Sequence, residues 1–354
     1  MLRQRNGACR TRRVPLAAPA PFLEPLDRLR AGARDYFGTD AVSFEPAAER
    51  RGRFGRVLRV GVETPGRRFA IFVKQFTAAS DSPKDIARQH HCLATEFART
   101  RQADAAFAAT PDIGVARPIA MFEDILTLVT EEAPGVGLDM ILKRIALRRT
   151  RGARDEAIVA LKRLGRWLRI FQSQVAVDDP AFRKDYRRYL ALRLRDLHRA
   201  GGIADPERDA AMAAYDRDAA LVAPGDLVPV AAHADLCPPN ILVAPDRVTV
   251  LDLAASVDRA KHMDVAFVYL HIALAGRRLL LGQSLVRELQ DAFLRSYDPA
   301  LERSAPAFRL MLLLQVIAHQ SGLATMRRAG VAGAVAEWRL RRERPWALSL
   351  ALSV

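Results

Sequence analysis

Short apolar runs rich in β-branched residues recur in the first third of the chain. They predict strands at 57–62 (VLRVGV), Phe69–Phe76, Val115–Ile119 and Ile125–Val129. A longer segment, Ile86–Ala109, has the pattern of a helix. Together these segments predict a small, mostly antiparallel sheet with one helix.

The rest of the chain is mainly helical in pattern. Apolar residues spaced three and four apart predict helices at Leu138–Leu147, Asp155–Val175, Arg183–Arg199, Pro206–Leu221 and through most of Val265–Val354. Short β-branched runs predict strands at 228–230, 241–243 and 248–251. Between the two halves, Thr130–Gly137 contains a proline and two glycines, which favours a connection between lobes.

These patterns predict an α+β fold with two lobes. We expect a small sheet lobe with one helix at 41–132 and a larger, mainly helical lobe at 133–354. An extension at 1–40 would precede them, made of a basic tail and a helix at Phe22–Phe37.

Polar residues interrupt the short strands of the second lobe. Asp235 and Asn240 lie on one predicted loop between strands, and Asp252 follows the end of a predicted hairpin strand. Their oxygen atoms can converge where the strands end, and hard cations such as Mg²⁺ prefer such ligands. A hairpin that carries a few surface acids is the alternative interpretation.

This pattern resembles the catalytic loop of protein-kinase-like phosphotransferases, in which H-x-D is followed by Asn and then by a metal-binding Asp. It is most similar to the aminoglycoside phosphotransferase and choline kinase branch, with the lipopolysaccharide-core kinases as a further candidate. In that branch the loop is usually H-G-D, and here Ala234 stands at the glycine position. A second Asp follows twelve residues after the metal-binding one, which is Asp264 after Asp252. The resemblance implies a bilobal protein-kinase-like fold.

The resemblance also implies roles for the residues in this pattern. Asp235 would orient the attacking hydroxyl, and Asn240 and Asp252 would hold Mg²⁺ against the phosphates of ATP. His233 would support the loop by hydrogen bonding, and Asp264, at a helix start, would accept backbone N–H groups and brace the loop.

Nucleotide contacts are expected in the first lobe. Lys74 stands where the family places its phosphate-binding lysine, and Glu96 is the only glutamate between Lys74 and Met121 that could pair with it. Two solvated surface charges are the alternative. The backbone from Glu131 to Ala133 is the expected adenine contact.

The glycines Gly52 and Gly55 form the remaining candidate nucleotide site. Their backbone could approach phosphates, although the fuller G-x-G-x-x-G pattern is lacking and a hairpin turn explains the pair equally well.

Composition adds a strong positive charge. The chain has 354 residues and a net charge of +15, but only six of its 55 basic residues are lysines. Such a charge could attract nucleic acid, an anionic membrane through the basic N-terminus, or an acidic substrate.

The cysteines Cys9, Cys92 and Cys237 lie far apart, which favours a reducing cytoplasm. No run reaches the 18 apolar residues of a membrane span, because Gln315 and His319 interrupt the most apolar segment.

We therefore expect an ATP- and Mg²⁺-dependent kinase that phosphorylates a hydroxyl of a small molecule or glycan. A catalytically silent kinase-like binding protein and a basic nucleic-acid-binding protein are the alternatives. The acceptor is expected to be anionic or neutral, because Lys261–Val354 has thirteen basic and seven acidic residues. The densest basic groups are Arg277-Arg278, Arg327-Arg328 and Arg339 to Arg344.

Overall fold

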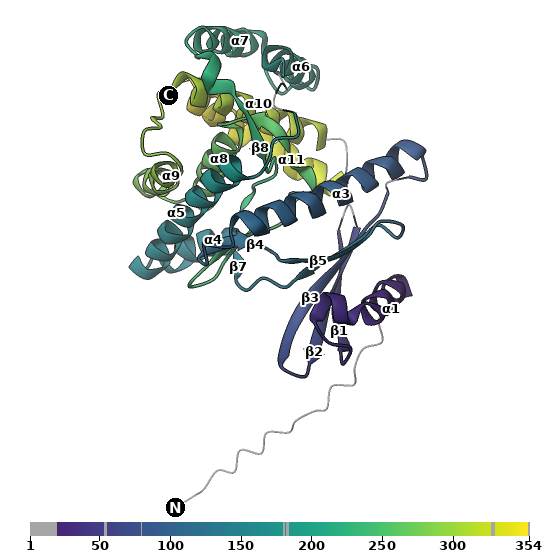
Figure 1. Cartoon of the computed structure of the whole chain (residues 1–354). Coiled ribbons are helices and arrows are strands. Elements are labelled where there is room, and N and C mark those ends of the chain that lie inside the picture. The colour runs from purple at the N-terminus through teal and green to yellow at the C-terminus, as the bar shows by residue number, and fades with distance from the viewer. Residues whose placement is uncertain are drawn as a thin grey trace, which may run out of the picture. The chain divides into compact units, whose positions relative to one another are not determined.

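The structure is a computed structural model that describes residues 20–52, 55–78, 80–179, 181, 184–326 and 330–352. The predicted basic tail, residues 1–20, lies outside the described residues except for Ala20. The chain folds as two compact units, coloured from purple to yellow along the sequence in Figure 1. One contains the residues up to Ala94 and Arg117–Glu132, and the other contains Thr95–Ala116 and the residues from Ala133 onward.

The first unit begins with short helices. The 3-10 turn η1 (Ala20–Phe22) leads into α1 (Leu23–Ala31), and α2 (Ala33–Phe37) follows. The predicted helix Phe22–Phe37 is therefore confirmed but divided at Gly32, which caps the end of α1. Gly38 ends α2 with φ of 74°, a conformation that glycine adopts without strain.

An antiparallel sheet forms the body of the first unit. Its strand order is β1 (Ser43–Gly52), β2 (Gly55–Thr64), β3 (Arg67–Phe76), β6 (Thr127–Glu131) and β5 (Pro118–Phe122). Burial alternates along β2 with the period of two expected for a strand, whereas the central strand β3 also buries the adjacent residues Ala70 and Ile71. The resulting core contains Phe22, Leu26, Leu29, Leu58, Val60, Ile71 and Val73.

The prediction of one strand at Val115–Ile119 is wrong. The segment belongs to two strands: β4 (Ile113–Val115) pairs in parallel with a strand of the second unit, and β5 pairs with β6 in the first unit. Their partners differ, so the strand ends where the chain leaves one sheet for the other. Pro118, which lacks an N–H group, begins β5.

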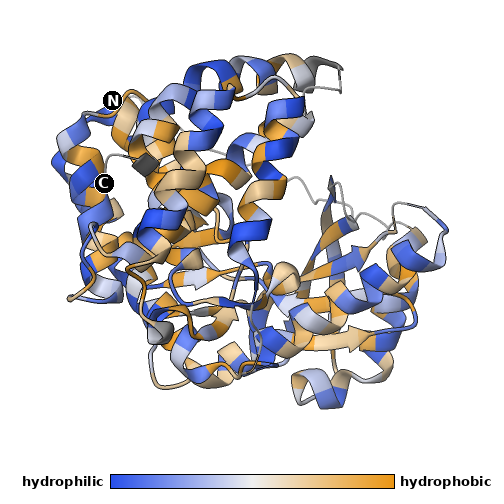
Figure 2. Cartoon of the chain, turned by 90° about the horizontal axis from the view of Figure 1, so that it is seen from above, coloured by the Kyte–Doolittle hydropathy of each residue, from blue (hydrophilic) through white to orange (hydrophobic). Residues whose placement is uncertain are grey.

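The second unit is mainly helical, as predicted. Its helices are α4 (Leu138–Arg148), α5 (Arg151–Gln174), α6 (Tyr186–Arg199), α7 (Asp205–Ala219), α8 (Met263–Arg278), α9 (Gln283–Tyr297), α10 (Pro306–Met326) and α11 (Gly330–Leu352). The helix α3 (Pro83–Ala106) begins in the first unit, and its later residues belong to the second. The colouring of Figure 2 shows hydrophobic and hydrophilic residues alternating along the helices, as expected for helices with one buried face.

Helix α5 provides the centre of the second core. Thr150 caps its first turn by accepting a hydrogen bond from the N–H of Ala153. The fully buried Trp167 stacks between Phe107 and Phe171, with ring centroids 5.4 and 4.7 Å away, and its indole N–H donates to the carbonyl of Gly114. The aromatic residues Trp167 and Phe171 of α5 therefore belong to the core of the second unit.

Helix α10 corrects the expectation about apolar segments. Its Pro306–Thr325 portion has a mean hydropathy of 1.2 and is long enough to cross a membrane by length and composition. However, 78% of that segment is buried, and α10 packs against α6, α7, α8 and α11. The apolar composition of α10 is accounted for by its place at the centre of a helical bundle.

Candidate active site

The predicted catalytic residues lie around two short pairs of strands in the second unit. One pair is β9 (Ile241–Val243) with β10 (Val248–Val250), and the other is β8 (Pro229–Ala232) with β11 (Val257–Ala260). Strands β9 and β10 belong to a sheet in the order β4-β10-β9-β7, where β7 is Val136–Gly137. These strands are the frame on which the polar side chains are placed.

The register of the β9–β10 hairpin brings Asn240 and Asp252 to the same end. Ile241 pairs with Val250, and the N–H of Leu251 donates to the carbonyl oxygen of Asn240 over 2.9 Å. Asn240 therefore precedes one strand where Asp252 follows the other. The predicted placement of both residues beside a hairpin is confirmed.

Asp264 holds the loop that follows β8. It is the second residue of α8 and is almost fully buried, and its carboxylate accepts hydrogen bonds from the N–H groups of His233 at 2.6 Å and Ala234 at 3.1 Å. Ala234 has φ of 65°, in the left-handed region that favours glycine. The two bonds from Asp264 supply the constraint that holds an alanine in this strained conformation.

His233 uses both ring nitrogens within the loop. Its Nδ1 accepts a hydrogen bond from the N–H of Asp235, so the proton is on Nε2, which donates to the carbonyl of Leu251 over 2.9 Å. The ring is fully buried and meets the edge of Trp167 at a centroid distance of 6.3 Å. His233 thus ties the end of β10 to the loop that carries Asp235.

Asp235 is half-buried beside Asn240 and Cys237. Burial raises the pKa of the Asp235 carboxyl, and the negative charge of Asp252 raises it further. The amide nitrogen of Asn240 donates to the backbone oxygen of Asp235 at 3.0 Å and to its Oδ2 at 3.3 Å. Burial next to this carboxylate also raises the pKa of the Cys237 thiol to about 12, so the thiol is protonated at neutral pH.

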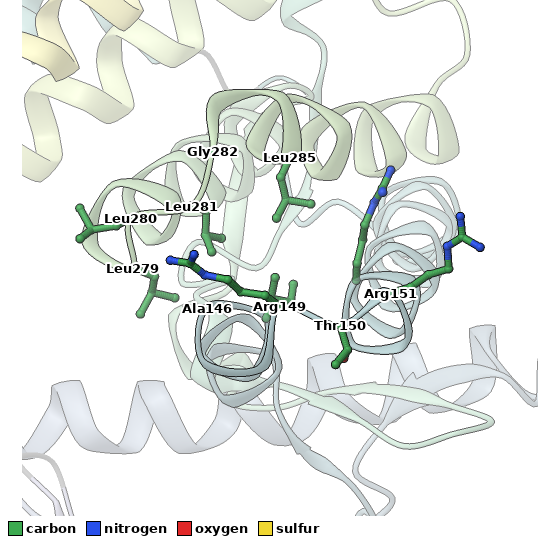
Figure 3. A pocket seen from close by; sticks show the side chains of 11 residues that line it. Ala146, Arg149, Thr150, Arg151, Leu279, Leu280, Leu281, Gly282 and Leu285 are labelled. Atoms are coloured by element: carbon green, nitrogen blue, oxygen red, sulfur yellow. The ribbon is translucent and has the colours of Figure 1, made fainter.

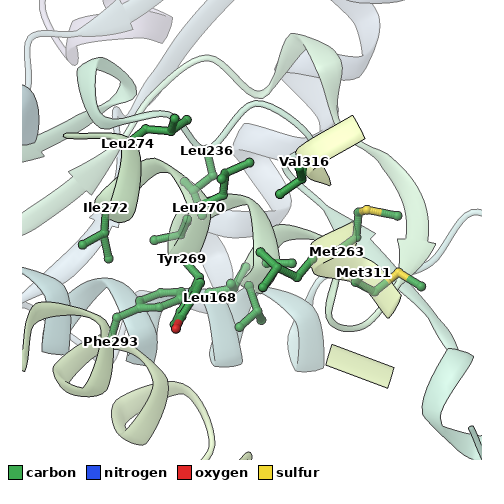
Figure 4. Packing of buried hydrophobic residues seen from close by; sticks show 14 of the residues in the cluster. Leu168, Leu236, Met263, Tyr269, Leu270, Ile272, Leu274, Phe293, Met311 and Val316 are labelled. Atoms are coloured by element: carbon green, nitrogen blue, oxygen red, sulfur yellow. The ribbon is translucent and has the colours of Figure 1, made fainter. Parts of the chain in front are cut away.

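The neighbour of Asp235 anchors the loop in the core. Leu236 is fully buried and belongs to the same cluster as Leu168 of α5 and Leu270 of α8 (Figure 4). The N–H of Cys237 donates to the carbonyl of Asp235, which makes a tight turn at Leu236, and this turn leaves the partly buried Asp235 at the edge of the core.

Asn240 and Asp252 have the chemistry of magnesium ligands. Asp235 engages the amide nitrogen of Asn240, so the amide oxygen is turned the other way. Asp252 is an exposed carboxylate with φ of 65° and ψ of 63°. Among the described residues, no group of three or more His, Cys, Asp or Glu side chains could hold a metal ion. Two oxygen donors fit Mg²⁺, which commonly takes one or two protein ligands and completes its shell with phosphates and water.

Lys74 and Glu96 lie on separate elements. Lys74 lies within β3 between Val57 of β2 and Leu128 of β6, and its Nζ is 4.8 Å from the centre of the Phe76 ring. Glu96 lies on α3 and is 6% exposed, which is unusually low for a glutamate. Their pairing stays a prediction.

The glycine pair closes the β1–β2 hairpin, with Gly52 opposite Gly55. A Cβ atom on Gly55 would lie 2.2 Å from the carbonyl oxygen of Gln75, so the neighbouring strand alone requires a glycine there. The hairpin interpretation therefore accounts for Gly55. The turn itself, residues 53–54, lies outside the described residues, and a phosphate contact stays a prediction.

Two N–H groups in the predicted adenine-binding segment already have partners. The N–H of Glu131 donates to the carbonyl of Arg117 and that of Glu132 to the carbonyl of Ala70, both over 2.8 Å. The side chain of Glu131 forms ion pairs with Arg67 and Arg117. An adenine contact at Glu131 or Ala133 stays a prediction.

The C-terminal arginines, predicted to line the acceptor site, are largely engaged within the fold. Arg278 forms two hydrogen bonds with Glu343, at 2.8 and 3.1 Å, and Arg277 donates to the carbonyl of Arg342. Arg341 pairs with Glu337 on the same helix. Arg327 and Arg328 lie outside the described residues. The excess of positive charge in this segment is therefore a weak argument for an anionic acceptor.

A pocket of about 550 Å³ lies elsewhere in the second unit (Figure 3). It is formed where the α4–α5 and α8–α9 connections meet, with leucines from the latter and arginines from the former. None of the predicted site residues lines it. Its lining carries no carboxylate or amide side chain, so it offers neither a base nor a magnesium ligand.

Comparison with known proteins shows which family the chain resembles. The model of the phosphotransferase enzyme family matches residues 56–308. No curated protein sequence matches the chain. The solved structures that resemble it share the fold at low sequence identity.

A candidate aminoglycoside phosphotransferase from Ralstonia eutropha is 17% identical, with a TM-score of 0.60 over 92% of this chain and 98% of that one. Choline kinase LicA from Streptococcus pneumoniae is 13% identical, with a TM-score of 0.52 over 92% and 99%. APH(2")-IIa, in its ternary complex with streptomycin and ATP, is 11% identical, with a TM-score of 0.52 over 95% and 100%.

The predicted α+β, protein-kinase-like fold is confirmed by these structures. The family match begins within β2, covers β3, β5 and β6 of the first unit, and includes every residue of the H-x-D, Asn and Asp pattern. The chain belongs to the phosphotransferase enzyme family, and it is a kinase with an alcohol group as its acceptor.

Proposed function

We propose that this kinase uses ATP and Mg²⁺ to phosphorylate a hydroxyl of a small molecule or a glycan that is anionic or neutral. The observation that carries this proposal is the convergence of Asp235, Asn240 and Asp252 at one end of the β9–β10 hairpin. A carboxylate beside two oxygen donors for a metal is the arrangement that phosphoryl transfer to a hydroxyl requires.

Asp235 is the residue that positions the acceptor in this mechanism. Its carboxylate accepts the hydrogen bond of the attacking hydroxyl and orients the oxygen toward the phosphoryl group. Burial raises the pKa of this carboxyl, which makes it a better proton acceptor than an exposed aspartate while it remains ionised. The amide of Asn240 donates a hydrogen bond to this carboxylate, and the N–H of Asp235 donates to Nδ1 of His233, so both the side chain and the backbone of Asp235 are held.

Asn240 and Asp252 are the residues that would hold Mg²⁺, which neutralises phosphate charge when bound. Lys74 would supply a further positive charge, and its place in the interior of the sheet restricts its motion. The ATP-bound form of APH(2")-IIa, which shares the fold, supports the choice of nucleotide. The free thiols of Cys92 and Cys237 support a cytoplasmic location.

The test is a coupled assay of ADP release with a panel of neutral, acidic and cationic hydroxyl compounds. We expect saturable, Mg²⁺-dependent turnover of at least one neutral or acidic compound. Efficient turnover of aminoglycosides or choline alone would contradict the proposed acceptor class. Stabilisation by nucleotide, with no ADP release for any acceptor, would favour a silent binding protein.

A further inference from the structure

Three basic side chains of the second unit lie close together without an acidic partner. Lys184 precedes α6, Arg193 lies on α6, and Arg259 lies on β11. Throughout the part of the chain that the structure describes, none of the three forms an ion pair with a carboxylate within 4.0 Å. This contrasts with Arg278 and Arg341 near the C-terminus, which pair with Glu343 and Glu337.

Two tyrosines bring this basic cluster (Lys184, Arg193 and Arg259) together. The Nζ of Lys184 is 4.2 Å from the centre of the Tyr189 ring, and the Cζ of Arg193 is 5.2 Å from the centre of the same ring. The hydroxyl of Tyr186 accepts a hydrogen bond from the N–H of Ala260 over 2.9 Å, which attaches α6 to β11 beside Arg259.

The electrostatics of the cluster are unfavourable when no anion is bound. Lys184 is half-buried, and burial lowers its pKa, which the positive charges of Arg259 and Arg193 lower further. Contact with the face of Tyr189 offsets part of this cost, by about 0.5–1 kcal/mol at such a site. A phosphate or carboxylate would remove the repulsion, and guanidinium groups bind such anions with two hydrogen bonds.

We infer that Lys184, Arg193 and Arg259 bind an acidic group, phosphate or carboxylate, of the acceptor itself. This inference rests on the proposed function, because it assigns the cluster to the acceptor of that reaction. It narrows the acceptor from anionic or neutral to anionic.

The topology places the cluster at a suitable distance from Asp235. Arg259 pairs with Val230 on β8, and β8 runs directly into the loop of His233 and Asp235. His233 lies three positions after Val230, which corresponds to about 10 Å along an extended chain. Asp258, on the opposite face of β11, pairs with Arg99 instead and leaves the face of Arg259 to the cluster. A molecule of one or two sugar units can span this distance.

The first experiment observes Lys184 directly. The chain has six lysines, so the ¹³Cε signal of Lys184 can be assigned in a lysine-labelled sample by comparison with Lys184→Met. We expect inorganic phosphate, and separately glucuronate, to raise the titration midpoint of Lys184 by about one pH unit, a tenfold change in proton affinity. Saturation with Mg²⁺ and a non-hydrolysable ATP analogue keeps phosphate out of the nucleotide site. An unchanged midpoint with both anions would overturn the inference.

The second experiment connects the cluster to the acceptor. Arg259→Gln and Lys184→Met are expected to raise KM for an acidic sugar at least tenfold, with KM for ATP unchanged. Arg259→Lys should recover part of the loss. Arg195→Gln is the matched control and should leave both KM values unchanged. Arg195 lies on α6, as Arg193 does, but it is exposed and lies beside Asp196. An unchanged KM in folded cluster variants would show that the acceptor does not use this site.

These outcomes separate the two proposals. Absence of ADP release with glucose, glucose 6-phosphate and glucuronate in the wild-type protein counts against the proposed function, whereas the Lys184 titration still decides whether the cluster binds anions. Turnover of glucose alone, with no response of Lys184 to phosphate, would leave the kinase in place and remove the anionic subsite.

Discussion

The N–H group of His233 donates to the carboxylate of Asp264 over 2.6 Å, although Asp264 lies 31 positions later in the chain. The same carboxylate accepts a hydrogen bond from the N–H of Ala234, so one buried side chain holds the loop that carries Asp235 against α8. Asp264 is therefore a positioning residue, and its removal is expected to affect stability before metal binding.

Asp264→Ala is expected to lower the free energy of unfolding by about 1–3 kcal/mol, because it leaves the buried N–H of His233 and the partly buried N–H of Ala234 without a partner. Denaturant unfolding measures the change. Asp209→Ala, which removes an exposed aspartate from α7, should have little effect. An Asp264→Ala protein as stable as the wild type but unable to bind Mg²⁺ would assign Asp264 to the metal instead.

Asp235→Asn is expected to fold and to bind Mg-ATP but to lose turnover by about 10²–10⁴-fold, the usual effect of removing a positioned base. Single-turnover kinetics with the acceptor identified by the ADP assay measures this loss. Wild-type turnover in the variant would exclude Asp235 from the proposed role.

The same variant gives a pH-dependent prediction for stability. The folded protein raises the pKa of Asp235 above its ordinary value of 3.8, so between these two values the folded state binds more protons than the unfolded state. Stability therefore falls as pH rises through this window. Asp235→Asn, which stays neutral, should have a free energy of unfolding at pH 7 at least as large as that of the wild type. The difference between the two proteins should become smaller below pH 3.8. Unfolding curves across this range test the sign.

Asp252→Ala is expected to abolish Mg²⁺-dependent nucleotide binding, because it removes an oxygen donor of the metal. Asp252→Asn is the matched variant, since asparagine also tolerates the left-handed conformation of this position. Titration calorimetry with and without Mg²⁺ measures both. If the two variants bind Mg-ATP as tightly as the wild type, Asp252 is not a metal ligand.

The sequence predicts best where a local pattern determines the structure. Helical spacing located α4 and α5 closely, and the polar residues between short strands identified Asp235, Asn240 and Asp252 as neighbours of one hairpin. The prediction of one strand at Val115–Ile119 is wrong because β4 and β5 pair with strands of different sheets. A local sequence pattern contains no information about which strand is the partner.

Charges were harder to interpret, because their partners are distant in sequence. Arg278 pairs with Glu343 across 65 residues, and this pairing removes it from the predicted acceptor site. No local pattern in the sequence distinguishes Lys184, because its positive neighbours Arg193 and Arg259 come close to it only when α6 and β11 pack together. A count of basic residues therefore does not show which of them lack an acidic partner in the fold.

Glu343 is the last residue for which the structure predicts a measurable effect. It is 3% exposed and lies between Arg278 at 2.8 Å and His319 at 3.2 Å. Burial alone would raise the pKa of its carboxyl, but hydrogen bonds from His319 and Arg278 outweigh burial and lower it to about 2. Because the folded pKa lies below the unfolded value of 4.5, the stabilisation is present above pH 4.5 and is lost as pH falls toward 2.

Glu343→Gln is accordingly expected to lower the free energy of unfolding at pH 7 by up to about 3 kcal/mol, since each pKa unit corresponds to about 1.4 kcal/mol. The difference in free energy of unfolding between the variant and the wild type should become smaller as pH falls below 4.5, because the wild-type carboxylate then becomes protonated and loses its charge. Glu302→Gln, at an exposed glutamate, is the control and should follow the wild type at every pH. Denaturant unfolding at pH 7, 4.5 and 3 tests the difference. A deficit of equal size at all three would show that the glutamine disturbs packing among α8, α10 and α11 and that the ion pairs contribute little.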